Sequence, residues 1–203
     1  MLDTKLIATL REKTGAGLVD VKQALDETGG DAAAAEELLR KKGIVKAGKK
    51  ADRVAGEGIV YAYIHSNKKV GVLVEVRCET DFVARNEAFS ALAHDLALHI
   101  AAMNPLYVDV AAVPPEVLEK EKEIYRAEMA GSGKPADIME KIIVGKVEKF
   151  LADVCLLRQQ FVKDETLTIE DVVKTAIAKM GENIQVKRFV RFHVGNDGAP
   201  AAC

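Results

Sequence analysis

The spacing of hydrophobic residues changes once along the chain. Up to about residue 45 they recur every three or four positions, which predicts three short amphipathic helices. The glycine-containing segments 14–17 and 29–30 separate these helices, Asp31 stands where it would cap the third, and Gly43 is expected to end it. Helices of this length form a minimal three-helix bundle. The side chains expected to face inward are Leu6, Ile7, Leu10, Leu18, Val21, Leu25, Ala35, Leu38 and Leu39.

From Gly56 onward the period becomes two, which predicts strands. The alternating runs are 58–65, 69–78 and 186–194. Helical periodicity fills the stretches 89–103, 114–131, 135–154 and 168–180. Strands that frame helices without regular alternation predict an α+β fold with a small antiparallel sheet of about three strands. One face is expected to carry Val70, Val72, Val74, Val76 and Cys78, and one side of the last strand Val186, Val190, Phe192 and Val194.

These patterns predict a division of the chain into four parts. They are the bundle at 1–45, a basic linker at 46–55, an α+β core at 56–196 and a flexible tail at 197–203. The helix at 114–131 is heavily charged with only a narrow apolar stripe, so it is expected to project from the body. Thr168 and Asp171 are spaced as a capping box for the last helix.

Composition narrows the classes of protein. Hydrophobic residues make up 49% of the 203 residues, which excludes wholesale disorder. A net charge of −2 and 5% aromatic residues give neither a basic surface nor stacking platforms, so no direct nucleic-acid binding is expected. The segment 41–53 carries six basic side chains and is interpreted as a solvated linker; the alternative is a patch for phosphates or an acidic partner.

Cysteine usage and the start of the chain bear on location. Cys78, Cys155 and Cys203 are odd in number and far apart, and no CxxC pair exists. The first ten residues lack the pattern of a secretory signal, and no apolar run approaches the ~20 residues of a membrane span. A cytoplasmic chain without metal or membrane contact is expected.

Motifs for catalysis are not convincing. The segment 130–135, "AGSGKP", can be compared with a phosphate-binding loop, whose motif is GxxxxGK followed by Ser or Thr. Aligned on Gly133 and Lys134, the motif would need glycine at Glu128 and Ser or Thr at Pro135, so the segment does not fit. His94 and His99 lie five residues apart and diverge around a helix, although Asp95 is placed to pair with His99. The favoured interpretation is therefore a non-enzyme. An enzyme that uses these three residues would show bound metal or a perturbed titration.

The segment 78–86, "CETDFVARN", connects a strand to a helix that Asn86 is placed to cap. Such connections are usually polar, yet Phe82 and Val83 lie among charged residues. Either Phe82 packs into the core beside Phe89, or a short loop pinned at both ends presents it to a partner at low entropic cost. In the second case Asp81 and Arg85 would anchor the contact.

Two motifs carry a resemblance to a known family. The segment 10–31, "LREKTGAGLVDVKQALDETGGD", followed by "CETDFVARN", is similar to bacterial elongation factor Ts, the nucleotide exchange factor of elongation factor Tu. "MNPLYV", "SGKP" and "KMGENIQVKRF" also match, so the resemblance covers nearly the whole chain. It implies a UBA-like N-terminal bundle, and an intrusion by Thr80, Asp81, Phe82 and Val83 between helices of the partner's GTP-binding domain.

The resemblance further implies that GDP release follows disturbance of the partner's Mg²⁺ and phosphate site, so this chain needs no cofactor of its own. Arg85 and Asn86 would support the intruding segment. The bundle would contact the partner through Gly15, Ala16, Gly17, Leu18, Val19 and Lys22.

Size adds one implication of the resemblance. Longer members carry a duplicated core, whereas this chain has room for one copy, which implies a homodimer through the core domain. Some short members have a cysteine in the final strand where this chain has Val190, so a disulfide at this place is excluded. The alternative function is a UBA-containing scaffold that binds RNA or the ribosome through the basic linker, with steeply salt-dependent binding.

Overall fold

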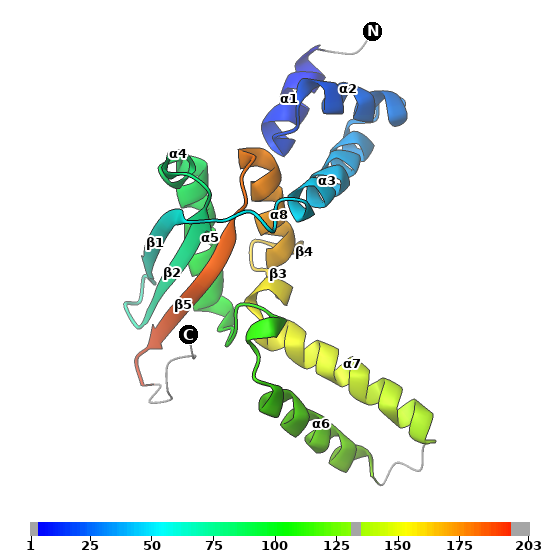
Figure 1. Ribbon diagram of the computed structural model, residues 1–203, viewed down its shortest axis with the longest axis vertical. Coiled ribbons are helices and arrows are strands. Elements are labelled where there is room, and N and C mark those ends of the chain that lie inside the picture. The colour runs from blue at the N-terminus through cyan, green and yellow to red at the C-terminus, as the bar shows by residue number, and fades with distance from the viewer. Residues whose placement is uncertain (1–3, 131–134, 196–203) are drawn as a thin grey trace.

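Helical units lie at both ends of the molecule, with a sheet between them (Figure 1). The structure, a computed structural model, describes residues 4–130 and 135–195. The N-terminal helices lie at one end, the sheet with its covering helices lies in the middle, and a two-helix arm extends at the other end. The predicted flexible tail at 197–203 and most of the segment 130–135, rejected above as a phosphate-binding loop, lie outside the described residues.

The N-terminal part is a three-helix bundle, as predicted. Its helices are α1 (Thr4–Thr14), α2 (Leu18–Glu27) and α3 (Ala32–Gly48). Asp31 caps α3, since its Oδ1 accepts hydrogen bonds from the backbone N–H groups of Ala33 and Ala34. The buried core consists of Ile7, Leu10, Val21, Ala24, Leu25, Ala35 and Leu39. The prediction that Leu18 faces inward is wrong. Leu18 is exposed, because the other two helices cover little of the first residue of α2.

The third helix does not end at Gly43, which is a second correction. It continues to Gly48, so the predicted boundary between residues 45 and 46 falls inside a helix. A Cβ atom at Gly43 would lie 3.2 Å from the Cβ of Ala178 in α8 (Ile169–Met180). The glycine therefore serves close packing of α3 on α8, which outweighs its low helix propensity.

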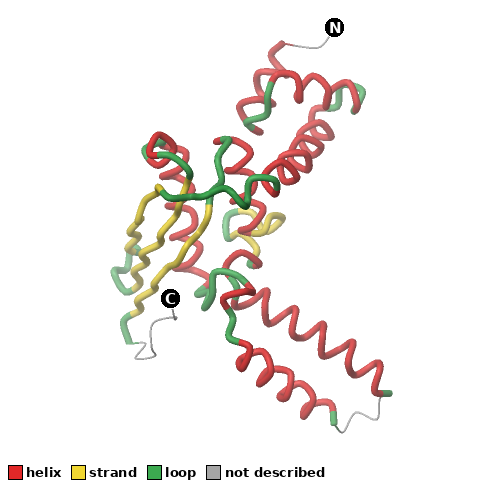
Figure 2. The backbone as a smooth tube through the Cα atoms, in the orientation of Figure 1, coloured by secondary structure: helices red, strands yellow, loops and turns green. Residues whose placement is uncertain are grey.

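The main sheet has the predicted three antiparallel strands (Figure 2). β1 (Glu57–Ile64) pairs with β2 (Val70–Cys78), and β2 pairs with β5 (Gln185–His193) across more than a hundred residues. The face predicted for β2 is buried at every expected position: Val70, Val72, Val74, Val76 and Cys78. The helix α5 (Glu87–Met103) covers this face with Phe89, Leu96 and Ile100.

For β5, the prediction that Val186, Val190, Phe192 and Val194 share one side is wrong for every residue after Val186. Val186 is opposite Val76, but Arg188 is opposite Glu75, so Lys187 is an extra residue in a bulge. Such an insertion reverses the alternation of all residues that follow it. Phe189 is consequently buried, whereas Phe192 is 63% exposed and Val194 is also exposed.

The remaining elements form the arm and a small ribbon. The arm consists of α6 (Pro115–Met129) and α7 (Ala136–Val154), and it projects as the charge of α6 indicates. Single 3₁₀ turns at Val110–Ala112 and Leu156–Arg158 flank its base. A second antiparallel pair, β3 (Gln160–Phe161) and β4 (Asp164–Thr168), was not predicted. The capping box of Thr168 and Asp171 is present at the start of α8.

Candidate functional site

The connection after β2 is a single helical turn, α4 (Asp81–Ala84), rather than the expected loop. The side chain of Thr80 caps it, because the hydroxyl oxygen accepts a hydrogen bond from the backbone N–H of Val83 at 3.4 Å. Asn86 caps the following helix α5 by accepting from the N–H of Ala88 at 2.8 Å, as predicted. Both ends of the turn are therefore fixed by local hydrogen bonds.

Phe82 projects from this turn into solvent. Its side chain is 83% exposed, so the interpretation that it packs beside the buried Phe89 is wrong. Val83, one residue on, faces the other way and packs against the main core. An exposed phenylalanine on a capped turn is a preorganised apolar contact, since little conformational entropy remains to be lost on binding.

Asp81 and Arg85 form an ion pair with each other across one turn, with 3.1 Å between Oδ2 and Nη2. The Arg85 side chain is largely in solvent and that of Asp81 is about half exposed. Surface pairs of this kind contribute about 1 kcal/mol or less. Either residue can therefore exchange its partner for a group on another protein at small cost.

The candidate residues of the bundle lie at the turn between α1 and α2. Gly15, with φ of +68°, turns the chain, and Gly17 precedes α2 without a side-chain cap. Leu18, Val19 and Lys22 are exposed on the first turns of α2. Val19, at 77% exposure, is the most accessible apolar side chain of this group.

The C-terminal end of α8 lies between these two sets of residues (Figure 1). A Cβ atom at Gly15 would lie 2.7 Å from the Cα of Lys179, so the α1–α2 turn packs directly on this helix end. Two residues beyond Met180, the carboxylate of Glu182 binds Thr80. The two predicted contact regions, residues 15–22 and residues 80–86, are thus connected through one short segment.

Replacing Gly15 with alanine is expected to lower the free energy of unfolding by about 2–4 kcal/mol, because a left-handed backbone and a clash with Lys179 act together. Chemical denaturation measures the change. Gly29 is a matched control, since its φ is +63° and a Cβ atom there meets no atom within 4 Å. Its alanine variant is expected to lose only the conformational part, about 1–2 kcal/mol. Equal losses at both positions would contradict the close approach at Gly15.

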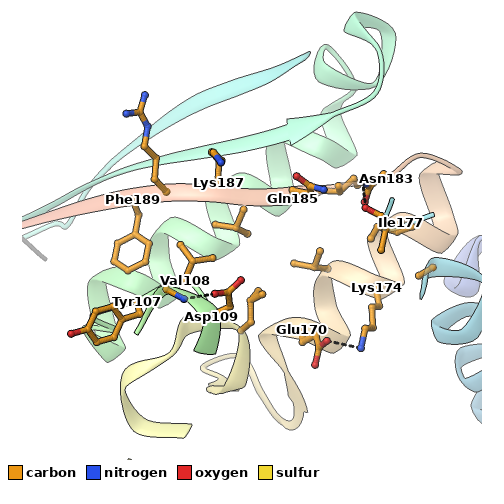
Figure 3. A pocket seen from close by; sticks show the side chains of 18 of the residues that line it. Tyr107, Val108, Asp109, Glu170, Lys174, Ile177, Asn183, Gln185, Lys187 and Phe189 are labelled. Atoms are coloured by element: carbon orange, nitrogen blue, oxygen red, sulfur yellow. Dashed lines mark hydrogen bonds and ion pairs between the residues drawn. The ribbon is translucent and has the colours of Figure 1, made fainter. Parts of the chain in front are cut away.

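An open groove of about 670 Å³ runs along β5, lined by residues of α8 and of the segment 106–114 (Figure 3). Its carboxylates already have structural partners: Asp109 accepts from the N–H of Ala112, and Glu170 pairs with Lys174. No histidine or cysteine lines it. The groove offers an apolar surface and no arrangement for acid–base or nucleophilic chemistry.

The histidines and the two described cysteines, Cys78 and Cys155, do not form a catalytic group either. Asp95 pairs with Lys163 at 2.6 Å, not with His99, and His94 contacts the hydroxyl of Tyr61. Burial raises the pKa of the Cys155 thiol to about 11, which keeps it protonated and unreactive at neutral pH. Within residues 4–130 and 135–195, no group of three or more potential metal ligands occurs.

His99 is instead a buried structural residue. Its Nδ1 accepts a hydrogen bond from the N–H of Val162 at 3.3 Å, which places the proton on Nε2, facing Gln159 Oε1 at 3.0 Å. Gln159 in turn donates to the carbonyl oxygen of Asp153. The imidazole therefore joins α5 to the end of α7 and to the ribbon.

Burial holds the pKa of His99 below its ordinary value, against the weaker opposing effect of Gln159. As the pH falls below about 6.5, the unfolded chain binds a proton that the folded chain does not, so stability is lost from that pH downward. The wild type is expected to lose up to about 1.4 kcal/mol more per pH unit than His99→Gln between pH 6.5 and 5.5. Urea titrations at each pH measure this. A wild-type slope in His99→Gln would contradict the assignment.

Sequence reasoning missed the residues that support the candidate turn from behind. Glu182 and Asn183 follow α8 and contact residues 79–80 across more than a hundred positions. No local pattern announces such a pairing. The segment "KMGENIQVKRF", which contains both residues, was noted only because it resembles the family, and not for any contact with residues 79–80.

Among the helices of residues 4–130 and 135–195, none is long and apolar enough to cross a membrane.

Comparison with known proteins agrees with the motifs. The family model described as Elongation factor TS matches residues 44–196. The Elongation factor Ts of Thermosipho melanesiensis is 55% identical over 195 residues, which is 96% of this chain and 100% of that protein. The Elongation factor Ts of Geotalea uraniireducens is 58% identical over 186 residues, covering 92% of this chain and 86% of that protein. That of Fervidobacterium nodosum is 54% identical over 194 residues, or 96% and 98%. The chain belongs to the elongation factor Ts family.

Proposed function

We propose that this protein is the guanine nucleotide exchange factor of elongation factor Tu and acts on the GDP-bound form in the cytoplasm. The observation that carries the proposal, beside the family, is the exposure of Phe82 on a helical turn that is capped at both ends. A side chain held in this way matches what an intruding contact requires, because binding then costs little ordering entropy.

In the proposed mechanism Phe82 enters between helices of the partner's GTP-binding domain. Asp81 releases Arg85 and becomes a polar anchor at the same contact, while Thr80 and Val83 hold the turn against the core. The intrusion loosens the Mg²⁺ ion and phosphate loop that hold the nucleotide's phosphates, and both belong to the partner. Exchange factor and GDP then weaken each other's binding by the same factor.

The bundle provides a second contact with the same domain. Its candidate residues are Gly15, Ala16, Gly17, Leu18, Val19 and Lys22, with the exposed Val19 as the apolar centre. The α1–α2 turn packs on the end of α8, and Glu182, just beyond α8, binds Thr80 at the start of α4. The bundle contact and α4, which carries Phe82, are therefore held in fixed positions relative to each other. The division of labour we propose is binding by the bundle and disturbance of the nucleotide site by the turn.

Release of a fluorescent GDP from elongation factor Tu tests the function. With excess unlabelled GDP, addition of this protein should accelerate release, and the effect should saturate with its concentration. Elongation factor Tu alone, at the same Mg²⁺ concentration, is the control. Absence of acceleration would contradict the proposal and favour the scaffold that binds RNA or the ribosome.

The structure supplies one argument against that scaffold. Of the six basic side chains in 41–53, four have partners within the chain: Lys41 with Glu37, Lys42 with Glu27, Lys50 with the carbonyl of Gly181, and Arg53 with Glu79. A phosphate would have to displace these four partners, so the segment is less available to nucleic acid than its six charges indicate.

We further propose a homodimer through the sheet. The side of the sheet opposite α5, termed the open sheet face, carries Val60, Ala62, Ile64, Gly71, Leu73, Glu75, Arg188, Val190 and Phe192 in adjacent cross-strand rows. Val60, Ile64, Leu73 and Phe192 are exposed in the single chain, and Val190 is half-buried. The one carboxylate of the face, Glu75, is neutralised by Arg77 and Arg188. An apolar face of this kind is suited to a second copy of itself around a two-fold axis.

A further inference from the structure

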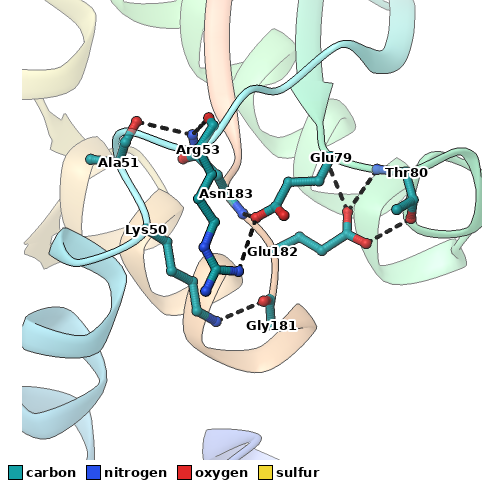
Figure 4. A network of polar contacts seen from close by, with 8 residues as sticks. All are labelled: Lys50, Ala51, Arg53, Glu79, Thr80, Gly181, Glu182 and Asn183. Carbon is teal, nitrogen blue, oxygen red and sulfur yellow. Dashed lines mark hydrogen bonds and ion pairs between the residues drawn. The ribbon is translucent and has the colours of Figure 1, made fainter.

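The turn that follows α8 lies beside Glu79 and Thr80, the residues that lead into α4 (Figure 4). The carboxylate of Glu182 accepts three hydrogen bonds there. Its Oε2 receives the backbone N–H groups of Glu79 at 3.1 Å and Thr80 at 3.0 Å, and its Oε1 receives the hydroxyl of Thr80 at 2.6 Å. One side chain thus satisfies two successive backbone donors and one side-chain donor of the segment that leads into α4.

The contact is reciprocal. The backbone N–H of Asn183 donates to Oε1 of Glu79 at 2.6 Å. The amide of Asn183, itself buried, donates to the carbonyl oxygens of Ala51 and Arg53, and thereby ties the segment after α3 to the same point. Lys50 adds a hydrogen bond to the carbonyl of Gly181. Three segments distant in sequence therefore meet behind α4.

The hydroxyl of Thr80 transmits this contact to the turn. It donates to Glu182 and accepts from the N–H of Val83, so its rotamer is fixed from both sides. Hydrogen bonds to an ionised carboxylate are shorter and stronger than those between neutral groups. Without Glu182, Thr80 could rotate away from its capping position, and the direction in which Phe82 projects would no longer be fixed.

We propose that Glu182 is a positioning residue for the exchange reaction, which acts through Thr80 to hold Phe82 in the orientation that enters the partner. The inference rests on the proposed function and deepens it. It assigns a role to a side chain outside the intruding segment, more than a hundred residues further along the chain. The role concerns preorganisation: the ordering of the turn is completed in the free protein and not during binding.

Glu182→Gln tests the inference, since glutamine keeps the size but loses the charge and replaces one acceptor oxygen with a donor group. At saturating factor, the maximal rate of fluorescent GDP release from elongation factor Tu is expected to fall 5- to 30-fold. The half-saturating concentration should change less than threefold, because the bundle still binds. Amide hydrogen exchange at Glu79 and Thr80 in the free protein should become faster.

Glu170→Gln is the matched control. It removes a carboxylate charge from α8, where Glu170 pairs with Lys174 at the surface, and it should leave GDP release unchanged. Thr80→Val removes the hydroxyl from the other side of the contact. Thr80→Val should lower the maximal rate of GDP release as Glu182→Gln does. The double variant, with both substitutions, should release GDP at about the rate of the less active single variant. Thr80→Val also serves as the test if Glu182→Gln does not fold.

The outcomes separate the inference from the function on which it rests. If the wild type does not accelerate release, the proposed function fails. If the wild type is active and Glu182→Gln equals it, the positioning role is wrong. A second comparison uses the Phe82→Ala background. A residue that acts through Phe82 has no further effect once that side chain is gone. The positioning role is therefore also wrong if Glu182→Gln slows GDP release by the same factor in Phe82→Ala as it does in the wild type.

Discussion

Replacing Phe82 with alanine is expected to slow GDP release from elongation factor Tu at saturating factor by at least about 30-fold relative to wild type. The size follows from the roughly 2 kcal/mol or more that central aromatic contacts contribute at interfaces. Since Phe82 is 83% exposed, the free energy of unfolding should change by no more than about 0.5 kcal/mol. Stopped-flow fluorescence and urea denaturation measure the two quantities.

The comparison needs a control that removes a similar exposed side chain elsewhere. Val144→Ala lies on the arm helix α7, where the valine is exposed, and it should release GDP at the wild-type rate. Phe82→Ala should still bind elongation factor Tu through the bundle, which a pull-down of the nucleotide-free partner detects. If Phe82→Ala accelerates GDP release as much as the wild type does, Phe82 has no role in the exchange.

If the proposed homodimer forms through the open sheet face, replacing Leu73 with glutamate is expected to convert it to a monomer. Leu73 is the central residue of the open sheet face, opposite Ala62 on β1 and Val190 on β5. A buried unpaired carboxylate costs about 3–5 kcal/mol, and a two-fold interface contains the substitution twice. The dissociation constant should therefore rise by more than about a thousandfold, which light scattering and sedimentation measure over a concentration series.

The fold should tolerate this change, because Leu73 is on the solvent side of the sheet in the single chain. Val144→Glu, which places the same charge on the arm, should remain dimeric. A wild type that is monomeric at all concentrations would exclude the dimer. A Leu73→Glu variant that remains dimeric would move the interface to another surface.

Much of the fold follows from local pattern. The strict alternation from Val70 to Cys78 predicts a strand with one buried face, and the stripe from Phe89 to Ile100 predicts the helix that covers it. The predictions fail where packing between distant segments decides. Gly43 has the propensity of a helix end, yet α3 continues because the glycine lets α8 approach. Lys187 fits an alternating strand, yet its bulge reverses the face of every residue after it.

The candidate site shows the same limit. The residue types of "TDFVARN" mark a segment with an unusual phenylalanine, and chemistry alone leaves both directions open for its side chain. Its exposure depends on Val83, which fills the core in its place, and on the caps at Thr80 and Asn86. Glu182 could not be found from spacing, because its three hydrogen bonds cross more than a hundred residues. The four-part division at 1–45, 46–55, 56–196 and 197–203 remains a proposal.

The contact of Phe82 with the partner can be measured by replacing this residue with the photoreactive analogue benzoylphenylalanine. Irradiation of its complex with nucleotide-free elongation factor Tu, followed by mass spectrometry, identifies the peptides within reach of the side chain. We expect cross-links to helices of the GTP-binding domain next to the Mg²⁺ and phosphate site, and loss of these cross-links when excess GDP is added. Cross-links confined to another domain of elongation factor Tu, or to a second copy of this chain, would contradict the proposed mechanism.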